Sequence, residues 1–243
     1  MIDQPNRLPR RPDRPAQDQT PDRPFDRPDQ AGLDVLSDVL RCVRLTSAML
    51  FLVDGCPPWV TQAPAARWLV QAALPGAQHL ISYHIVAEGG CWVGLTGAEP
   101  QHLSAGDILV IPHGDPYFLA DPYRPALPPC NTDESIAFFS RMAAGELPTV
   151  VTAGAGSPPR THFICSFLGC DMRPFNPILA ALPPVLCVRR AGHSDEVGGL
   201  IRLALRELCD RRSGSREVLL RLSELMFIAT VRHYLQAMPE AQR

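Results

Sequence analysis

The sequence predicts a mainly β domain with added helices, in which an antiparallel β-barrel is followed by two C-terminal helices. Three observations support this α+β class. Short apolar runs follow one another between Leu80 and Leu119 and are separated by glycine-containing turns. Further short apolar runs flank this stretch, and the segment 191–243 changes to helical periodicity. Closely spaced strands of this kind are typical of sandwiches and barrels.

The stretch from 80 to 119 contains the clearest strands. Its apolar runs are Ile81 to Val86, Cys91 to Leu95 and Ile108 to Ile111. β-branched and aromatic residues in runs of this length, bounded by glycines, predict antiparallel strands. The proline-rich sequence at 112–116 could not lie in a central strand, so the last of these strands must end before it.

The N-terminal segment 1–31 is predicted to be a disordered tail rich in Pro, Arg and Asp. Asp-Arg-Pro recurs at 13–15, 22–24 and 26–28, and few apolar side chains are present to be buried. Such a segment cannot offset its own ordering entropy. From Leu33 to Val43 apolar residues recur at helical spacing and predict a short amphipathic helix beside the barrel.

The barrel domain is expected over residues 32–190. Prolines punctuate 120–160, which is expected to form an excursion over one mouth or flank of the barrel. Besides the central strands, the predicted strands are 48–53, 68–70, 161–168 and 185–188, and the predicted helical segments are 133–144 and 176–181.

The segment 191–243 is predicted to be a helical hairpin that acts as a dimerisation element. Ser194 can cap its first helix, and the second helix is expected from Arg216 to Ala237. Apolar residues of the second helix occupy more than one face, so it needs two partners, which we expect to be the barrel and a second subunit. The residues expected in the dimer contact are Leu222, Leu225, Ile228 and Ala229.

Composition bounds the class of protein. The 243 residues are 46% hydrophobic, so the chain can form a core. The net charge is −2, so there is no excess of basic residues with which to bind nucleic acid. We therefore expect no direct DNA binding by this chain. With no signal peptide and no long apolar run, we expect no membrane association. The eight cysteines form no CxxC pair and predict a reduced, cytoplasmic protein, and the abundant Arg, Ala and Pro indicate a bacterial source.

His84 is the leading candidate for a pocket residue. Side chains alternate along a strand, so Ser82 and His84 share one face while Tyr83 and Ile85 share the other. Three roles are open for His84: a hydrogen-bonded core histidine, a contact to a small effector, or a metal ligand. Trp92 is expected in the core. Short motifs of serine hydrolases, zinc proteases and phosphate-binding loops are absent from the sequence.

The stretch around His84 resembles a cupin, a fold that carries two short motifs. In each motif a histidine of the family pattern is replaced here, by Ser82 in the first and by Tyr117 in the second. The second pattern, G-x5-P-x-G-x2-H, is otherwise complete. The matching residues are His84 and Glu88 in the first motif and Gly106, Pro112 and Gly114 in the second.

The chain is also similar to the N-terminal, cupin-type ligand-binding (sensor) domain of AraC-family transcription regulators, over residues 33–238. This similarity rests on four segments in a fixed order. They are YHIV at 83–86 with CW at 91–92, GDILVIPHGD at 106–115, FICSFLGCD at 163–171 and PILAALPPVL at 177–186.

The resemblance implies a module that senses a small molecule and dimerises, that is not an enzyme and that needs no cofactor. In the family, helix-turn-helix DNA-binding units follow such a module, and here they would begin where the chain ends at Arg243. The expected partners are an unidentified effector and a second subunit, in a homodimer or in a mixed dimer with a full-length regulator. The expected pocket residues are Ser82, His84, Tyr117 and Cys165.

Two alternatives remain open at this point. One is a pure dimerisation partner, and the other is a small metal-dependent cupin enzyme such as an isomerase or dioxygenase. Catalytic cupins present three histidines and a carboxylate to the metal, but Ser82 and Tyr117 are poor transition-metal ligands, so no metal is expected. The remaining metal alternative is zinc held by His84, Cys165 and one of His113 or Tyr117, with His113 the residue chosen here.

Overall fold

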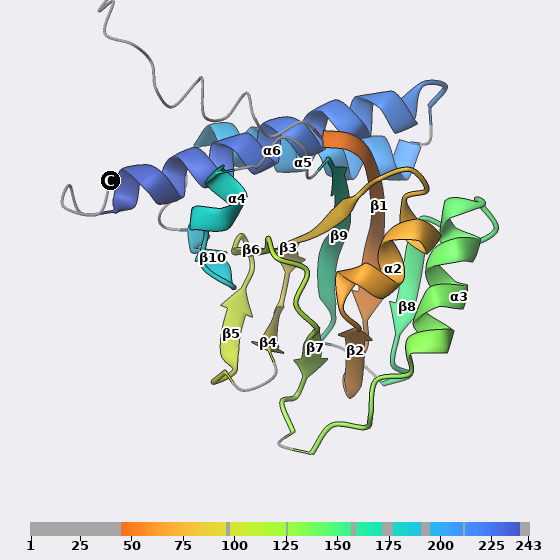
Figure 1. Ribbon diagram of the computed structural model, residues 1–243. Coiled ribbons are helices and arrows are strands. Elements are labelled where there is room, and N and C mark those ends of the chain that lie inside the picture. The colour runs from red at the N-terminus through yellow and green to blue at the C-terminus, as the bar shows by residue number, and fades with distance from the viewer. Residues whose placement is uncertain are drawn as a thin grey trace, which may run out of the picture. The chain divides into compact units, whose positions relative to one another are not determined.

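The computed structural model describes residues 45–95, 98–124, 126–156, 159–171, 177–190, 195–210 and 212–238 (Figure 1). They form two β-sheets that face each other, together with helices that cover the sheets. The tail predicted at 1–31 and the helix predicted at 33–43 lie outside the described residues.

The larger sheet has six strands in the order β10-β6-β3-β9-β1-β8, and the smaller has four in the order β2-β7-β4-β5. The predicted barrel fold with C-terminal helices is confirmed, although β1 and β8 pair in parallel. Strands of the larger sheet are β1 (Leu45–Gly55), β3 (His79–Glu88), β6 (Ile108–Ile111), β8 (Val150–Ala153), β9 (Thr161–Cys170) and β10 (Leu186–Val188). Those of the smaller sheet are β2 (Trp59–Ala63), β4 (Gly90–Leu95), β5 (Gln101–Ser104) and β7 (Tyr117–Asp121).

The larger sheet is buried on both faces, so it separates two hydrophobic cores. One core fills the barrel and includes Phe51, Phe163 and Phe167 of the larger sheet with Leu119 of the smaller. The other core lies on the outer face. Because side chains alternate along a strand, β1, β3, β6, β9 and β10 contribute to both cores, whereas the edge strand β8 contributes only to the barrel core.

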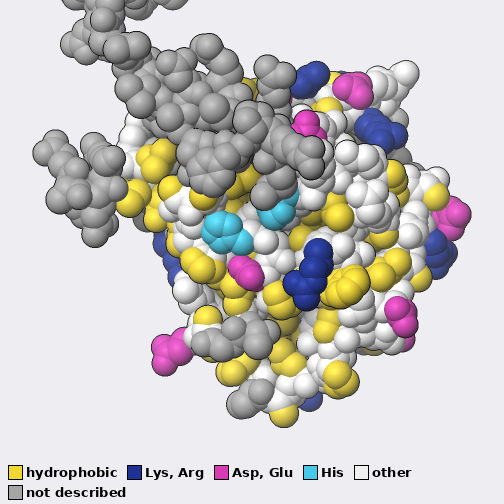
Figure 2. All heavy atoms as spheres, viewed as in Figure 1, with side chains coloured by type: hydrophobic (Ala, Val, Ile, Leu, Met, Phe, Trp, Pro, Cys, Tyr) yellow, Lys and Arg dark blue, Asp and Glu magenta, His cyan; other side chains and the backbone are white. Residues whose placement is uncertain are grey.

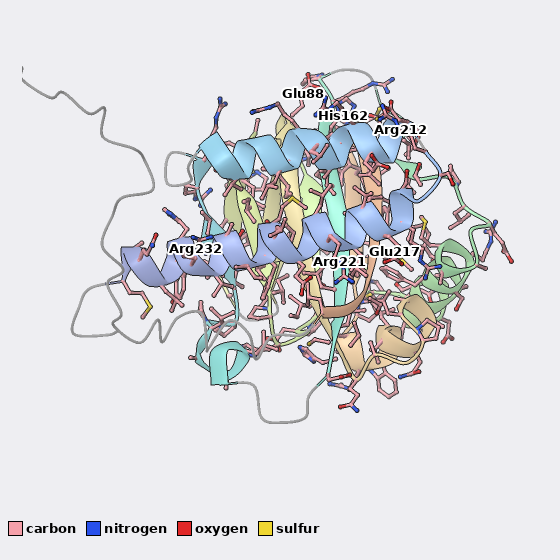
Figure 3. All side chains as sticks on the ribbon, turned by 90° about the horizontal axis from the view of Figure 1, so that it is seen from above. Glu88, His162, Arg212, Glu217, Arg221 and Arg232 are labelled. Atoms are coloured by element: carbon pink, nitrogen blue, oxygen red, sulfur yellow. The ribbon has the colours of Figure 1, made fainter. Side chains whose placement is uncertain are left out.

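Two long helices cover the outer face of the larger sheet and complete the outer core. They are α5 (Asp195–Asp210) and α6 (Ser215–Ala237), close to the ranges predicted for them. Figure 3 shows them side by side over the strands, and their buried residues include Ala204, Phe227 and Val231. Within the described part of the chain, no helix is long and apolar enough to cross a membrane.

Two shorter helices lie in ranges where the sequence predicts helical segments. Helix α3 (Thr132–Ala143) forms where the sequence predicts a helix, and the side chain of Asn131 caps it by accepting from the Glu134 amide at 3.2 Å. The helical segment predicted at 176–181 corresponds to α4 (Pro177–Ala181).

The strand predicted at 68–70 is wrong, since these residues belong to helix α2 (Ala66–Ala73). The buried residues Ala66, Leu69, Val70 and Ala73 recur at spacings of three and four, as they do on one face of a helix. This helical period outweighs the strand propensity of a three-residue run. Trp68 lies off the buried face and is 55% exposed.

A buried carboxylate holds the β5–β6 turn against the end of β10. Asp107 accepts from the amides of Ser104 at 3.0 Å and Arg190 at 2.9 Å, and from the Arg189 guanidinium at 2.9 Å. Burial raises the pKa of Asp107, but these hydrogen bonds and the charge of Arg189 outweigh it, so the pKa is lowered overall. The ionised carboxylate therefore stabilises this corner of the barrel.

We predict that Asp107→Ala lowers the free energy of unfolding by about 3 kcal/mol, because it leaves the buried donors of the turn without an acceptor. Because the folded-state pKa is depressed, this stabilisation is present above the unfolded value and is lost as the pH falls through the folded value. Chemical denaturation at neutral and acidic pH measures both effects. The exposed Glu99→Ala is the matched control, and equal losses in the two variants would contradict the prediction.

Candidate functional site

A cavity of about 370 Å³ lies inside the barrel and reaches helix α3. Its lining comes from β1, β2, β3, β7, β8 and β9 and from α3. Its deep polar residues are His84 on β3, Tyr117 on β7 and Cys165 on β9, and all three are buried. A cavity of this size is within the range of small-molecule sites.

The strand register brings these polar residues together. On β3, His84 stands opposite Cys165 of β9, and alternation places Ser82 on the same face as His84. Tyr117 is supplied by the other sheet, and its hydroxyl lies 2.6 Å from His84 Nε2. A hydrogen bond also joins Ser82 to the Tyr117 side chain. Ser82, Tyr117 and His84 therefore form a short hydrogen-bonded chain across the two sheets.

Burial keeps this group of side chains uncharged. It lowers the pKa of His84 to about 3, so the imidazole is neutral at physiological pH. Burial raises the pKa of Tyr117, and the neighbouring Cys165 raises it further. Burial likewise raises the pKa of the Cys165 thiol well above its ordinary value. The inner cavity thus offers neutral hydrogen-bonding groups, with neither a thiolate nor a cation.

The hydrogen bond to Tyr117 determines which nitrogen of His84 carries the proton. A phenol is a stronger acid than a neutral imidazole, and an imidazole nitrogen is the better acceptor, so the Tyr117 hydroxyl donates to Nε2. The proton of the neutral ring then resides on Nδ1. This atom is buried and has no hydrogen-bond partner in the described structure.

Aromatic rings form a connected part of the inner surface, next to smaller aliphatic side chains. Phe51 stacks on Phe167 with ring centroids 6.0 Å apart, and Phe139 meets Phe167 edge-on at 4.7 Å. Phe138 reaches Phe51 at 5.6 Å, and Phe167 also contacts the His84 ring at 5.7 Å. Two of these rings belong to α3, so this helix closes one side of the cavity.

The mouth of the cavity is more polar than its interior. Gln62 on β2 and Glu134, Ser135 and Thr152 near the opening are part of the lining. Among the described lining residues there is neither Arg nor Lys. An anionic ligand would therefore find no countercharge in this site.

The structure brings Ser82, His84, Tyr117 and Cys165 together, and all of them except Ser82 line the cavity, but it separates His113 from them. His113 is exposed outside the cavity, where its Nε2 lies 2.8 Å from the Leu182 carbonyl oxygen. The turn that follows β6 carries this side chain away from His84 and Cys165, so the expectation of zinc held by these three residues is wrong.

The motif carboxylate also lies outside the barrel. Glu88 is exposed, and its Oε2 is 2.9 Å from Nδ1 of His162. Figure 3 shows the two side chains next to each other. An irregularity in the β3–β9 register after Val86 precedes this change of direction. Within the described ranges, no group of three or more His, Cys, Asp or Glu side chains is placed to hold a metal ion.

The sequence analysis did not predict the aromatic lining, although one local signal points to part of it. Phe167 lies two residues from Cys165 on the same strand, so alternation puts both side chains on one face. Phe138 lies next to Phe139 in the predicted helix, but nothing local indicates that this helix covers a cavity. That information is tertiary.

The four predicted dimerisation residues do not share one environment. Leu222 is only 5% exposed and packs in the outer core of its own chain, so its assignment to a dimer contact is wrong. Leu225 is 51% exposed, whereas Ile228 and Ala229 are half-buried. The reason is helical geometry, because α6 turns Leu222 towards the sheet and Leu225 away from it.

The sequence matches a known protein family. The family model described as Cupin matches residues 34–236, which is most of the chain. No curated protein matches the sequence significantly.

We predict that His84 makes the protein acid-sensitive. Burial lowers the pKa of His84 to about 3 in the folded state, from an ordinary value of 6.5 that also applies to the unfolded chain. Between these two pH values only the unfolded chain binds the proton, so the folded state becomes less stable as the pH falls. Between pH 7 and pH 5 the wild type should lose about 2 kcal/mol more than His84→Phe. Urea denaturation at both pH values measures the difference. His113→Phe, at an exposed ring, should retain the wild-type loss, and equal losses in His84→Phe and wild type would refute the prediction.

Proposed function

This chain belongs to the cupin family, and we propose that it is a small-molecule-sensing and dimerisation module of AraC-type transcription regulation. In this proposal the effector occupies the barrel cavity and the α5–α6 pair carries the response. The observation that supports it best is that neighbouring residues of β3 face the two functional regions. His84 faces the cavity, while Tyr83 faces α6.

The contact between β3 and α6 is specific and buried. The Tyr83 hydroxyl lies 3.0 Å from Thr230 Oγ1 and 3.5 Å from the Met226 carbonyl oxygen of α6. Thr230 itself donates to the Met226 carbonyl at 2.7 Å. A ligand that shifts His84 must therefore act on the strand that holds α6 through Tyr83. This arrangement provides a short physical route from cavity to helix.

The outer side of α6 provides a surface for a second subunit. Val218 is 41% exposed and Leu225 is 51% exposed, and these residues are seven positions apart on one side of the helix. On α5, Leu203 is 37% exposed. Exposed apolar side chains in register along a helix are typical of helix–helix interfaces, so we place the dimer contact here rather than at Leu222.

DNA recognition in this proposal belongs to other polypeptide segments. On the face in Figure 2, Arg side chains are scattered among acidic and apolar ones and form no continuous basic patch. Phosphate binding needs clustered basic groups. The module would therefore act as a homodimer, or as a mixed dimer with a chain that carries a DNA-binding unit.

The rival proposal is a metal-dependent cupin isomerase or dioxygenase. Such an enzyme needs several donor groups directed at one metal. Here the Nε2 lone pair of His84 is used by Tyr117, and Glu88 points outward to His162. Elemental analysis of the purified protein separates the two proposals, since close to one transition metal per chain would favour the enzyme.

We predict that the double variant Val218→Asp/Leu225→Asp is a folded monomer, whereas the wild type is a dimer. Both side chains face away from the sheet, so the charges weaken the interface without entering the core. Light scattering coupled to size-exclusion chromatography measures the mass. The control pair Gln101→Asp and Arg141→Asp, at exposed sites on β5 and α3, should leave the dimer intact. A monomeric wild type would contradict the dimer proposal.

We predict that ligand binding in the barrel slows amide exchange in α6. The probe is prodan, an uncharged naphthyl ketone whose emission shifts to the blue in apolar sites. Hydrogen exchange should slow in peptides that cover Met226 to Thr230 when prodan is bound to the wild type. In Tyr83→Phe prodan should still bind, but the change in α6 should be reduced because the bond to Thr230 is lost.

A control variant and one contrary result complete this test. Phe138→Leu is the control, since it alters the cavity wall without touching α6 and should keep the exchange response once prodan is saturating. Identical α6 exchange in free and prodan-bound wild type would show that the cavity is not coupled to the helices. The sensing proposal would then fail.

A further inference from the structure

We infer that the barrel cavity selects an uncharged, largely aromatic ligand that carries one hydrogen-bond acceptor, which receives the Nδ1 proton of His84. This inference rests on the proposed sensing function and adds the chemical class of the effector. It is carried by three features of the site: the aromatic lining, the absence of basic side chains among the described lining residues, and one unpartnered donor.

The lining determines the body of the ligand. Phe51, Phe138, Phe139 and Phe167 form a connected set of rings in which each ring contacts at least one other edge-on or stacked. Flat aromatic groups can continue such a pattern because offset and edge-on ring contacts are favourable. A cavity of about 370 Å³ has room for a ligand of two fused or linked rings.

The electrostatics of the site determine the charge of the ligand. The inner polar groups His84, Tyr117 and Cys165 are neutral, as their pKa shifts show. At the mouth, the ionisable side chain in the described lining is the acidic Glu134. A carboxylate, sulfonate or phosphate would lose its hydration and gain no opposite charge, so anions are excluded.

The hydrogen bonding of the site determines the polar atom of the ligand. His84 is 2% exposed and lines the cavity, and its Nε2 is engaged by the Tyr117 hydroxyl. Nδ1, the remaining ring nitrogen, carries the proton and lacks an acceptor. A buried donor without a protein partner costs free energy, and a carbonyl or ether oxygen of a ligand that accepts its proton would remove that cost.

A matched series of compounds tests this inference by displacement of prodan from the full chain. Benzophenone has two rings and one carbonyl acceptor, diphenylmethane has the same rings without the acceptor, and 4-benzoylbenzoate adds a negative charge. The wild type should bind benzophenone about tenfold more tightly than diphenylmethane, as one hydrogen bond to a buried donor allows. Binding of 4-benzoylbenzoate should be weaker than that of benzophenone by a similar factor or more.

Variants assign the selectivity to His84. In His84→Phe the preference for benzophenone over diphenylmethane should fall to about one, because the donor is gone. In Tyr117→Phe the preference should fall partly, because the hydrogen bond that fixes the proton on Nδ1 is lost. Cys165→Ala is the matched control, since it alters both affinities together and should keep their ratio. Should His84→Phe fail to fold, Tyr117→Phe still tests the inference.

The possible results distinguish a failure of this inference from a failure of the proposed function. Equal affinity for benzophenone and diphenylmethane in the wild type overturns the acceptor contact, and tight binding of 4-benzoylbenzoate overturns the neutral class. If benzophenone binds in the predicted order but α6 exchange does not change, the ligand class stands and the sensing function fails. If α6 responds to prodan but the series shows no preference, the sensing function stands and the ligand class is wrong.

Discussion

The structure depends on the burial of both faces of strand β3. Residues 80–86 are all buried, yet alternate side chains enter different cores. His84 lies in the barrel and Tyr83 beneath α6. A slip of one residue in the pairing of β3 with β6 and β9 would exchange these two environments, and would bring apolar side chains such as Ile85 into the polar part of the cavity. The register of this strand therefore fixes the cavity and the docking of α6 at the same time.

The hydrogen-bonded chain in the barrel shows how the replacement of motif residues changes the chemistry available to the fold. Where two imidazoles would offer lone pairs to a metal, Ser82 and Tyr117 offer hydroxyl groups. The Tyr117 hydroxyl uses the Nε2 lone pair of His84 at 2.6 Å, so the imidazole is held as a neutral donor. In a low-dielectric interior this is a stable arrangement, because no net charge is buried and most polar groups have partners. Such an interior is suited to holding an uncharged molecule.

Much of the fold could be predicted from the sequence because the patterns that specify it are local. Short runs of β-branched and aromatic residues bounded by glycine turns mark the strands between Ile81 and Ile111, and the 3.6-residue period marks α5 and α6. Alternation alone puts Ser82 and His84 on one face. The predictions that were wrong concern features that depend on tertiary context. The short run around Leu69 fits either a strand or a helix, and only its burial against the barrel distinguishes the two. Spacing alone does not show which apolar residues of α6 face the sheet, as Leu222 does, and which face solvent.

The unpartnered Nδ1 of His84 connects stability to the proposed function. A buried donor without an acceptor costs about 1–3 kcal/mol, a large fraction of the stability of a typical domain. A fold under selection for stability alone would place an acceptor beside it or replace the histidine by an apolar residue. Retaining the donor makes sense if a ligand completes the hydrogen bond, because a ligand at 100 times its Kd stabilises the folded state by about 2.7 kcal/mol. That stabilisation would be applied to β3, the strand whose opposite face bonds to Thr230 of α6. Under the proposed sensing function, binding of a ligand in the barrel and stabilisation of α6 would therefore be coupled through this one strand, which is buried on both faces.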